Sequence, residues 1–303
     1  MKNIINYYYG FNIVDIYNIN NAFYFNYNNY SYIFLLFDRR VEETNSIYKL
    51  YLELKKRNIF TNDIIINKDN QLITFVNNIP YILIRDNTKN KLIDLNDILY
   101  IQNNTYNIIN DKSITRNDWT NLWQLKIDYY EGQIDDISRK YTLIGNTIDY
   151  YIGLGENAIS YLVYNEHKNN NYVLSHRELY LKNNSFSFYN PVNYILDSRV
   201  RDFAEYIKIQ FFTDKLDFNL FSIYLNYLNF NKSEYIELIS RLLFPTYYFD
   251  LLDEIIVNNE NENIIKNVLD KNKDYLLFLK NTFNYIVYTK KINIPFIEWI
   301  IKY

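Results

Sequence analysis

The sequence predicts an α+β fold in which a small antiparallel sheet carrying one helix precedes a larger helical part. Two patterns support this prediction. Up to about residue 86, short aromatic and β-branched runs surround a single segment with helical periodicity. From about residue 115 onward, the apolar residues recur mostly at helical spacing. A chain of 303 residues is long enough for one large domain or for two lobes with a substantial core.

The N-terminal elements can be placed from local patterns. Ala22–Tyr27 and Tyr30–Phe37 are predicted strands joined by a tight turn at Asn28-Asn29. A helix is predicted over Val41–Arg57, because its apolar residues form one stripe, consisting of Ile47, Leu50, Tyr51 and Leu54. Strand character then returns in three runs, at residues 64–67, 71–76 and 79–84. The order is therefore that of a sheet interrupted once by a helix.

A polar stretch over residues 85–91 indicates a linker at the end of the sheet. We therefore predict an N-terminal sheet lobe over residues 1–86 and a C-terminal helical lobe over residues 87–303.

Two long helices are expected after the linker. Thr115–Asp118 fits the capping-box pattern, and a long apolar stripe follows it from Trp119 to Ile137. The second helix is predicted over Thr147–Tyr164 and contains Gly153 and Gly155. A glycine inside a helix costs about 1 kcal/mol relative to alanine. We therefore expect close packing against a neighbouring backbone at these glycines.

Short strands are predicted at Tyr172–Leu174, which leads into Ser-His-Arg-Glu, and at Val192–Leu196, which ends at Asp197. From Arg201 to the end, the pattern is mostly helical.

Composition excludes several classes of protein. The formal net charge of −3 and the isoelectric point near 5.6 give no basic face, so we expect no nucleic-acid partner. Cysteine is absent, which excludes disulfides, thiolate metal sites and a cysteine nucleophile. No secretory signal and no apolar run of about 20 residues is present, so we expect no membrane partner and a cytoplasmic location.

The chain is crowded with Asn, Ile, Tyr, Lys and Phe. We interpret this bias as the effect of AT-rich codons; the alternative is a tyrosine-rich surface used in assembly or cross-linking. Residues with GC-rich codons that remain in such a chain are the most informative. They concentrate between Arg116 and Ala158 and between Arg177 and Ala204.

Five segments resemble one protein family. They are Trp119–Glu131, Asp149–Ile159, His176–Leu179, Asp197–Ile207 and Leu242–Asp250. Together they resemble the spore-coat kinase-like proteins of endospore-forming bacteria, of the CotS type and especially its degenerate YutH-like branch, within the aminoglycoside phosphotransferase and protein-kinase-like superfamily. The resemblance spans roughly residues 20 to 255 and implies a two-lobed, protein-kinase-like fold. It also implies a location in the spore coat as an alternative to the cytoplasm.

Phosphoryl transfer in such a fold needs a lysine on the sheet and a backbone cradle for the phosphates. The resemblance places this lysine near Leu35, Leu36 and Phe37, none of which is basic, and no glycine occurs between Gly10 and Gly132 to form a phosphate loop. The neighbouring cations Arg39 and Arg40 are alternatives, but a guanidinium on a turn replaces a positioned ammonium poorly. We interpret Phe37 as a core residue and the two arginines as solvated.

The catalytic loop can be compared in the same way. His176-Arg177-Glu178 stands where the superfamily has His-Gly-Asp, which implies a catalytic role for Glu178 and loop support from His176. Glutamate is one methylene longer than aspartate, and a misplacement of about 1 Å costs about 10²-fold in rate. Asn183 and Asp197 fall at the positions implied for the metal ligands.

The segment after Asp197 is open to two interpretations. The interval to Asp202 is shorter than in active members of the family, so the intervening loop looks deleted. Alternatively, Asp202 and Arg201 are structural, as a carboxylate in the first turn of a helix and its partner.

Two other groups of residues match no known zinc site or serine-nucleophile pattern. His167 lies in a polar loop and is expected to be exposed, and two histidines without cysteine have no zinc spacing. Ser175 beside His176 lacks the Gly-x-Ser-x-Gly elbow of a serine nucleophile.

These observations lead to two function hypotheses. The first is a degenerate kinase-like protein that acts through protein–protein assembly, with other coat proteins as partners and the cleft between the lobes available to a small molecule; it requires no cofactor. The alternative is an active small-molecule phosphotransferase that uses Mg-ATP, with Glu178 orienting the acceptor hydroxyl and Asn183 and Asp197 on Mg.

Overall fold

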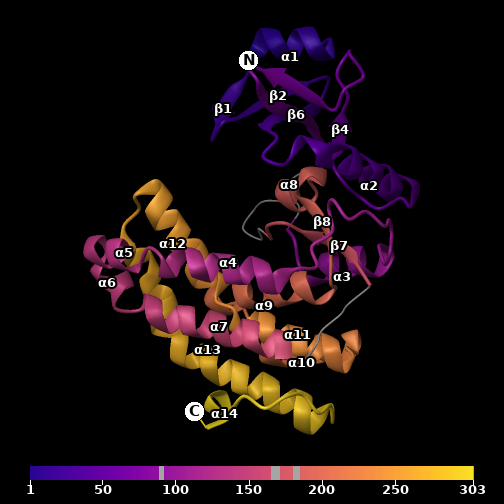
Figure 1. The fold of residues 1–303 in the computed structure, drawn as a ribbon. Helices are drawn as coiled ribbons and strands as arrows, with labels where there is room; N and C mark the ends of the chain where they lie inside the picture. The colour runs from indigo at the N-terminus through magenta and orange to yellow at the C-terminus, as the bar shows by residue number, and fades with distance from the viewer. Residues whose placement is uncertain (89–91, 165–170, 180–184, 303) are drawn as a thin grey trace. The chain divides into compact units, whose positions relative to one another are not determined.

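The computed structural model describes residues 1–88, 92–164, 171–179 and 185–302. The chain forms two compact units (Figure 1). The first unit comprises Met1–Arg116 and Asn171–Arg199, and the second comprises Asn117–Asn170 and Val200–Tyr303. The expected boundary between residues 86 and 87 separates the two lobes of a kinase-like fold, which are not the same division as these two compact units. That boundary stays a prediction.

The first unit contains a six-stranded antiparallel sheet in the order β1-β2-β3-β6-β4, with β5 also paired to β6. Its strands are β1 Tyr17–Ile19, β2 Ala22–Tyr27, β3 Tyr30–Leu36, β4 Asp63–Ile65, β5 Ile73–Val76 and β6 Ile79–Asp86. The single helix predicted within it is α2, Thr44–Lys56, preceded by a 3-10 turn over Val41–Glu43. The buried stripe of α2 contains Ile47, Leu50 and Leu54, as predicted, whereas Tyr51 of the predicted stripe is only partly buried.

Asparagine takes over the turn positions that usually need glycine. The turns between β1 and β2, β2 and β3, and β5 and β6 each consist of two asparagines with positive φ, at Asn20-Asn21, Asn28-Asn29 and Asn77-Asn78. Asparagine tolerates the left-handed region better than other residues with a side chain, and such turns match the twist of a hairpin. A chain poor in glycine can therefore still build tight hairpins.

The rest of the first unit includes helices that were not predicted and a second sheet whose two strands were predicted. Helix α1, Lys2–Tyr9, lies beside β1 and β2 in Figure 1, and its Ile5 is buried against Phe25 and Phe34 of the sheet. Helix α3, Leu95–Asn104, begins with a capping box between Asp94 and Asp97. A second, two-stranded sheet pairs β7, Val173–His176, with β8, Tyr194–Asp197. Between them lie α8, Ser185–Phe188, and a 3-10 turn over Pro191–Asn193.

The second unit is helical. Its helices are α4 Trp119–Glu131, α5 Ile134–Lys140, α6 Thr142–Gly145, α7 Ile148–Tyr164, α9 Val200–Phe212, α10 Phe218–Leu228, α11 Lys232–Leu243, α12 Thr246–Asn258, α13 Lys266–Asn284 and α14 Glu298–Lys302. A 3-10 turn over Glu262–Ile265 precedes α13, and a π-helical turn over Tyr285–Thr289 extends it. Helix α11 is central, because it packs against α7, α9 and α13 and is buried from Glu234 to Leu243. Stacked aromatic pairs such as Trp123–Phe244 and Tyr151–Tyr248 fill the spaces between these helices.

Three expectations for this region were wrong in detail. Thr115 is not a helix cap, because its hydroxyl donates to the Asp111 carbonyl at 2.6 Å and its backbone bridges to Leu196. The expected long stripe is divided between α4 and α5 at Gly132-Gln133. Neither glycine of α7 meets a neighbouring backbone: a Cβ at Gly155 would instead lie 2.6 Å from the Ile127 side chain, and the space at Gly153 is open.

Candidate functional site

The predicted catalytic and metal-binding residues that the structure describes lie on or beside the β7–β8 hairpin. His176 is the last residue of β7 and pairs with Tyr194, whereas Asp197 is the last residue of β8 and pairs with Val173. Glu178 follows two residues after His176. Asn183 lies outside the described residues, as does His167, so neither is placed.

His176 is fully buried and fixed from two sides. Its Nε2 lies 2.9 Å from the carbonyl oxygen of Phe188, and because a carbonyl only accepts, Nε2 carries the proton. Its ring stacks on the Phe188 ring with centroids 4.3 Å apart. This is the kind of backbone hydrogen bond expected of a loop-supporting histidine, and the supporting role stays a prediction.

Glu178 is exposed, and its backbone is held in place by Asn193. The Glu178 N–H donates to Asn193 Oδ1 at 3.0 Å, and Asn193 Nδ2 donates to the Glu178 carbonyl at 2.8 Å. Asp197, in contrast, is almost completely buried, and its Oδ1 accepts the Ser198 N–H at 2.7 Å.

The register places Asp197 opposite Val173 at one end of the β7–β8 pair, whereas Glu178 follows two residues after His176, which lies at the other end of the pair. Over the described part of the chain, no group of three or more His, Asp or Glu side chains could hold a metal ion. The catalytic role of Glu178 and the metal roles of Asn183 and Asp197 therefore stay predictions.

Apolar residues fill the position expected for the phosphate-binding lysine. Strand β3 ends at Leu36 and contains no basic residue. Phe37 is buried in the core, as predicted, and its N–H donates to the Pro80 carbonyl at 2.9 Å.

Arg39 departs from the expectation that it is solvated. Its side chain is only 2% exposed, whereas that of Arg40 is 70% exposed as expected. Arg39 Nη1 donates to the carbonyls of Val192 at 3.0 Å and Tyr194 at 2.6 Å, and its Nε donates to Glu43 Oε2 at 2.7 Å. The guanidinium therefore ties the connection between β3 and α2 to the strand that ends at Asp197.

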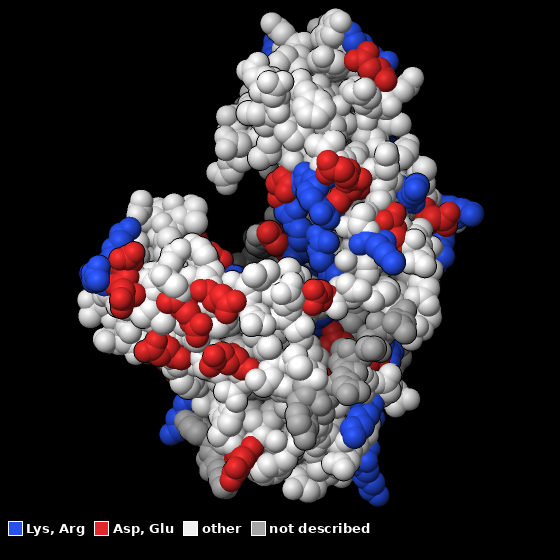
Figure 2. Space-filling view, in the orientation of Figure 1, with Lys and Arg blue, Asp and Glu red and all other residues white. Residues whose placement is uncertain are grey.

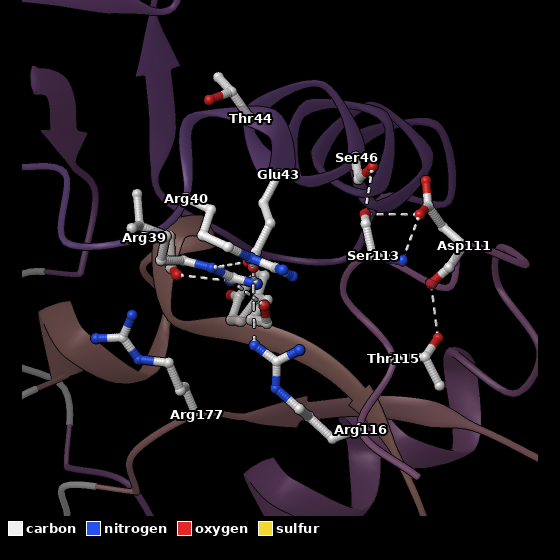
Figure 3. A network of polar contacts seen from close by, with 12 residues as sticks. Arg39, Arg40, Glu43, Thr44, Ser46, Asp111, Ser113, Thr115, Arg116 and Arg177 are labelled. Atoms are coloured by element: carbon white, nitrogen blue, oxygen red, sulfur yellow. Dashed lines mark hydrogen bonds and ion pairs between the residues drawn. The ribbon is translucent and has the colours of Figure 1, made fainter. Parts of the chain in front are cut away.

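Glu43 is the centre of a cluster of arginines, shown in Figure 3. We use the name Glu43 cluster for Glu43, Arg39, Arg40 and Arg116. Arg39 approaches Oε2 of the carboxylate, while Arg40 Nε donates to Oε1 at 2.8 Å and Arg116 Nη2 lies 4.0 Å from the same oxygen. Beside the cluster, Arg177 forms an ion pair with Asp38.

The charges of the cluster shift one another's pKa values. Burial lowers the pKa of Arg39; Glu43 opposes this effect, while the positive charges of Arg116 and Arg177 add to it. Burial alone would raise the pKa of the Glu43 carboxyl, but Arg40, Arg39 and Arg116 outweigh burial and hold it below its ordinary value. Glu43 is therefore ionised at neutral pH, and the cluster carries an excess of positive charge.

Arg201 and Asp202 lie in the first turn of α9, as the structural interpretation of this pair requires. Arg201 Nη1 donates to Asp202 Oδ1 at 3.0 Å, and both residues are buried. The Arg201 guanidinium also lies over the ring of Trp119, 5.1 Å from its centroid.

Comparison with known proteins decides the family. Residues 2–282 match the protein family described as "Spore coat putative kinase YutH". The chain belongs to this family. A curated member, the endospore coat-associated protein YutH of Bacillus subtilis (strain 168), is 25% identical over 218 residues, which cover 60% of this chain and 61% of the relative. The chain thus matches less than two thirds of that relative's length.

Solved structures show that this member of the YutH family has the aminoglycoside phosphotransferase fold. An aminoglycoside phosphotransferase from Alicyclobacillus acidocaldarius superposes with a TM-score of 0.65 at 10% identity, covering 90% of this chain and 92% of that chain. A spectinomycin phosphotransferase in complex with AMP gives a TM-score of 0.58 at 17% identity, covering 85% and 90%. The predicted kinase-like α+β fold, with an antiparallel sheet, one helix and a larger helical lobe, is confirmed.

The Glu43 cluster was not predicted from the sequence. Arg116 lies at the start of the region in which residues with GC-rich codons concentrate, and this was the available signal. No local sequence pattern connects Arg116 with Glu43, because the two residues are far apart in the sequence and meet only through the fold.

Within the described residues, no helix is long and apolar enough to cross a bilayer.

Proposed function

We propose that this protein is a kinase-like member of the spore coat that has little or no phosphotransferase activity and acts through protein–protein assembly. The observation that carries the proposal is the state of Arg39. A residue that replaces the phosphate-binding lysine needs a free cationic head, but the Arg39 guanidinium is buried and used by Glu43 and two backbone carbonyls. Leu35, Leu36 and Phe37 offer no cation, and Arg40, the other alternative, lies beyond the end of β3 and donates to Glu43 Oε1.

Two further observations support the proposal. Among the described residues, no group of three or more His, Asp or Glu side chains could hold a metal ion, so Glu178 and Asp197 belong to no such group there. The curated relative is named as an endospore coat-associated protein, which suggests the coat as the place of action.

Nucleotide binding and turnover test this proposal. Calorimetry and thermal-shift measurements with Mg-ATP and Mg-ADP should give weak binding or none, and no hydroxylated small molecule should be phosphorylated. Tight Mg-ATP binding together with turnover of such a molecule would show that the proposal is wrong.

The second candidate is an active phosphotransferase acting on a hydroxyl, which is favoured by the likeness of the fold to a spectinomycin phosphotransferase solved with ADP and spectinomycin. Here Glu178 would orient the acceptor, and Asn183 and Asp197 would hold the metal. Glu178→Gln should then abolish phosphorylation without changing the melting temperature, because the Glu178 side chain is exposed. If the wild-type protein phosphorylates nothing, this candidate is excluded.

A further inference from the structure

The Glu43 cluster has more positive than negative charge. A single carboxylate faces three guanidiniums, of which Arg39 takes one oxygen while Arg40 and Arg116 share the other. The adjacent pair of Arg177 and Asp38 adds one charge of each sign, and Glu178 is a further carboxylate that acts on Arg177. Like charges held close together in a partly buried region repel, and an anion of two charges would balance them.

Arg116 has donors that nothing described accepts. Its side chain is 27% exposed, and its one polar contact among the described residues is the ion pair with Glu43 at 4.0 Å, which is too long for a hydrogen bond. A guanidinium carries five N–H donors in a planar fork. Because burial removes much of the water that would otherwise satisfy them, the Arg116 donors favour a ligand with several acceptor oxygens.

The exposed side of the cluster is open to such a ligand. Arg40 is 70% exposed while it contacts Glu43, so its remaining donors face solvent next to Arg116. Arg39 and Glu43 are buried and form a fixed base beneath them. Figure 2 shows Lys and Arg side chains gathered beside Asp and Glu side chains where Figure 1 shows the β7–β8 hairpin.

We propose that Arg40 and Arg116 bind a phosphoryl group, as a dianion with three acceptor oxygens. Guanidiniums bind phosphate oxygens through paired, charge-assisted hydrogen bonds, and a dianion matches the excess of two positive charges. A carboxylate would leave one of these charges unbalanced. Arg40, but not Arg116, was considered above as a replacement for the phosphate-binding lysine. Binding of a phosphoryl group does not require its transfer, so the proposal holds whether or not the protein transfers phosphate.

The test is calorimetry of the full chain with three probes: inorganic phosphate, a phosphoserine peptide and the same peptide with unmodified serine. We expect saturable binding of the first two and none of the third. Arg40→Gln and Arg116→Gln should each weaken binding about tenfold, because each removes a charge-assisted contact. Arg139→Gln is the matched control, since Arg139 is equally exposed on α5 and pairs only with Asp136 among the described residues; it should bind as the wild type does.

The two sources of a phosphoryl group give different results. Binding of the phosphopeptide at least tenfold tighter than phosphate indicates a phosphorylated partner protein, and equal affinities indicate a free phosphate. The proposal is overturned if neither probe binds, if the serine peptide binds as well as the phosphopeptide, or if Arg40→Gln binds like the wild type. Arg40 decides the matter even if Arg116→Gln fails to fold, because the exposed Arg40 side chain contributes little to stability.

Discussion

At the residue scale, two glycines of α7 lie in different surroundings although only one residue separates them. A Cβ at Gly153 would meet nothing within 4 Å, whereas one at Gly155 would lie 2.6 Å from Cδ1 of Ile127. We expect Gly153→Ala to raise the free energy of unfolding by about 1 kcal/mol through helix propensity. Gly155→Ala should instead lower it by about 1–3 kcal/mol through overpacking. Urea denaturation measures both changes.

The valine variant of Ile127 provides the control for this prediction. Ile127→Val removes Cδ1, so Gly155→Ala should cost less in that background than in the wild type. Equal stabilisation by the two Gly→Ala changes would contradict the packing seen at Gly155.

Asp63 is the residue whose titration should affect stability most clearly at low pH. Burial alone would raise the pKa of its carboxyl, but hydrogen bonds from Lys55, Asn87 and Arg85 outweigh burial and lower the pKa to about 2. The folded state therefore holds this proton more weakly than the unfolded state, whose pKa is 3.8. The resulting stability, roughly 2 kcal/mol, is present above about pH 4 and is lost as the pH falls toward 2.

Denaturation at several pH values tests this sign. In the wild type, the free energy of unfolding should fall steeply between about pH 4 and pH 2. Asp63→Asn should be less stable at neutral pH and should show a shallower fall over the same interval. A slope that is the same in both proteins would mean that Asp63 does not carry this effect.

At the element scale, Arg39 connects segments that are distant in the chain. It lies between β3 and α2, while the carbonyls that it binds belong to Val192 and Tyr194. Arg39→Met should lower the free energy of unfolding by about 3 kcal/mol or more, because it leaves buried carbonyls and part of a buried carboxylate without partners. Arg40→Met is the matched control: it removes the other close partner of Glu43, but from an exposed side chain, and should cost less than about 1 kcal/mol.

The two variants should be compared by urea denaturation and by hydrogen exchange. Arg39→Met should also increase the exchange of amides in β8, whereas Arg40→Met should leave them protected. Similar losses of stability from both changes would show that the buried ion pair of Arg39 and Glu43 contributes no more to stability than the exposed contact of Arg40 with Glu43.

Elements formed by local patterns were predictable from the sequence. The turn at Asn28-Asn29 and the stripe of Ile47, Leu50 and Leu54 depend on neighbours in the chain, and both predictions were confirmed, whereas the hairpin at Asn20-Asn21 was not predicted. Helix α3 could have been found as well, because Asp94 and Asp97 form its capping box. Thr115 was a wrong prediction because a capping pattern is short. Its hydroxyl donates to the Asp111 carbonyl, and the helix begins only at Trp119.

At the scale of the whole molecule, the order of sheet and helices was predictable, but the polar site was not. Arg39 donates to carbonyls that lie 153 and 155 residues further along the chain, and the periodicity of apolar residues in the sequence cannot predict such a contact. For this reason Arg39 was predicted to be a solvated cation. The family resemblance supplied the fold, which local patterns alone support only in part.

The abundance of tyrosine is also a property of the whole molecule. Of the 34 tyrosines, several are fully buried, among them Tyr130, Tyr151, Tyr194, Tyr235, Tyr248 and Tyr275. Others, such as Tyr7 and Tyr288, are largely exposed. Tyrosine therefore serves as an ordinary core residue here and not only as a surface group for assembly or cross-linking. This is compatible with codon bias as the origin of its abundance.

The buried tyrosines predict unfolding in alkali. Burial raises the pKa of Tyr248 to about 12 and raises the pKa of Tyr194 and Tyr275 further, because the ionised phenol is poorly solvated in the core. The folded state therefore keeps protons that the unfolded state loses near pH 10, so this contribution to stability is complete below pH 10 and decreases above it. Tyrosinate absorbance should rise in two phases, a reversible one near pH 10 from exposed residues and a later one that coincides with loss of helical circular dichroism. A single phase near pH 10 with the helical signal retained would mean that these side chains are accessible to solvent in the folded protein.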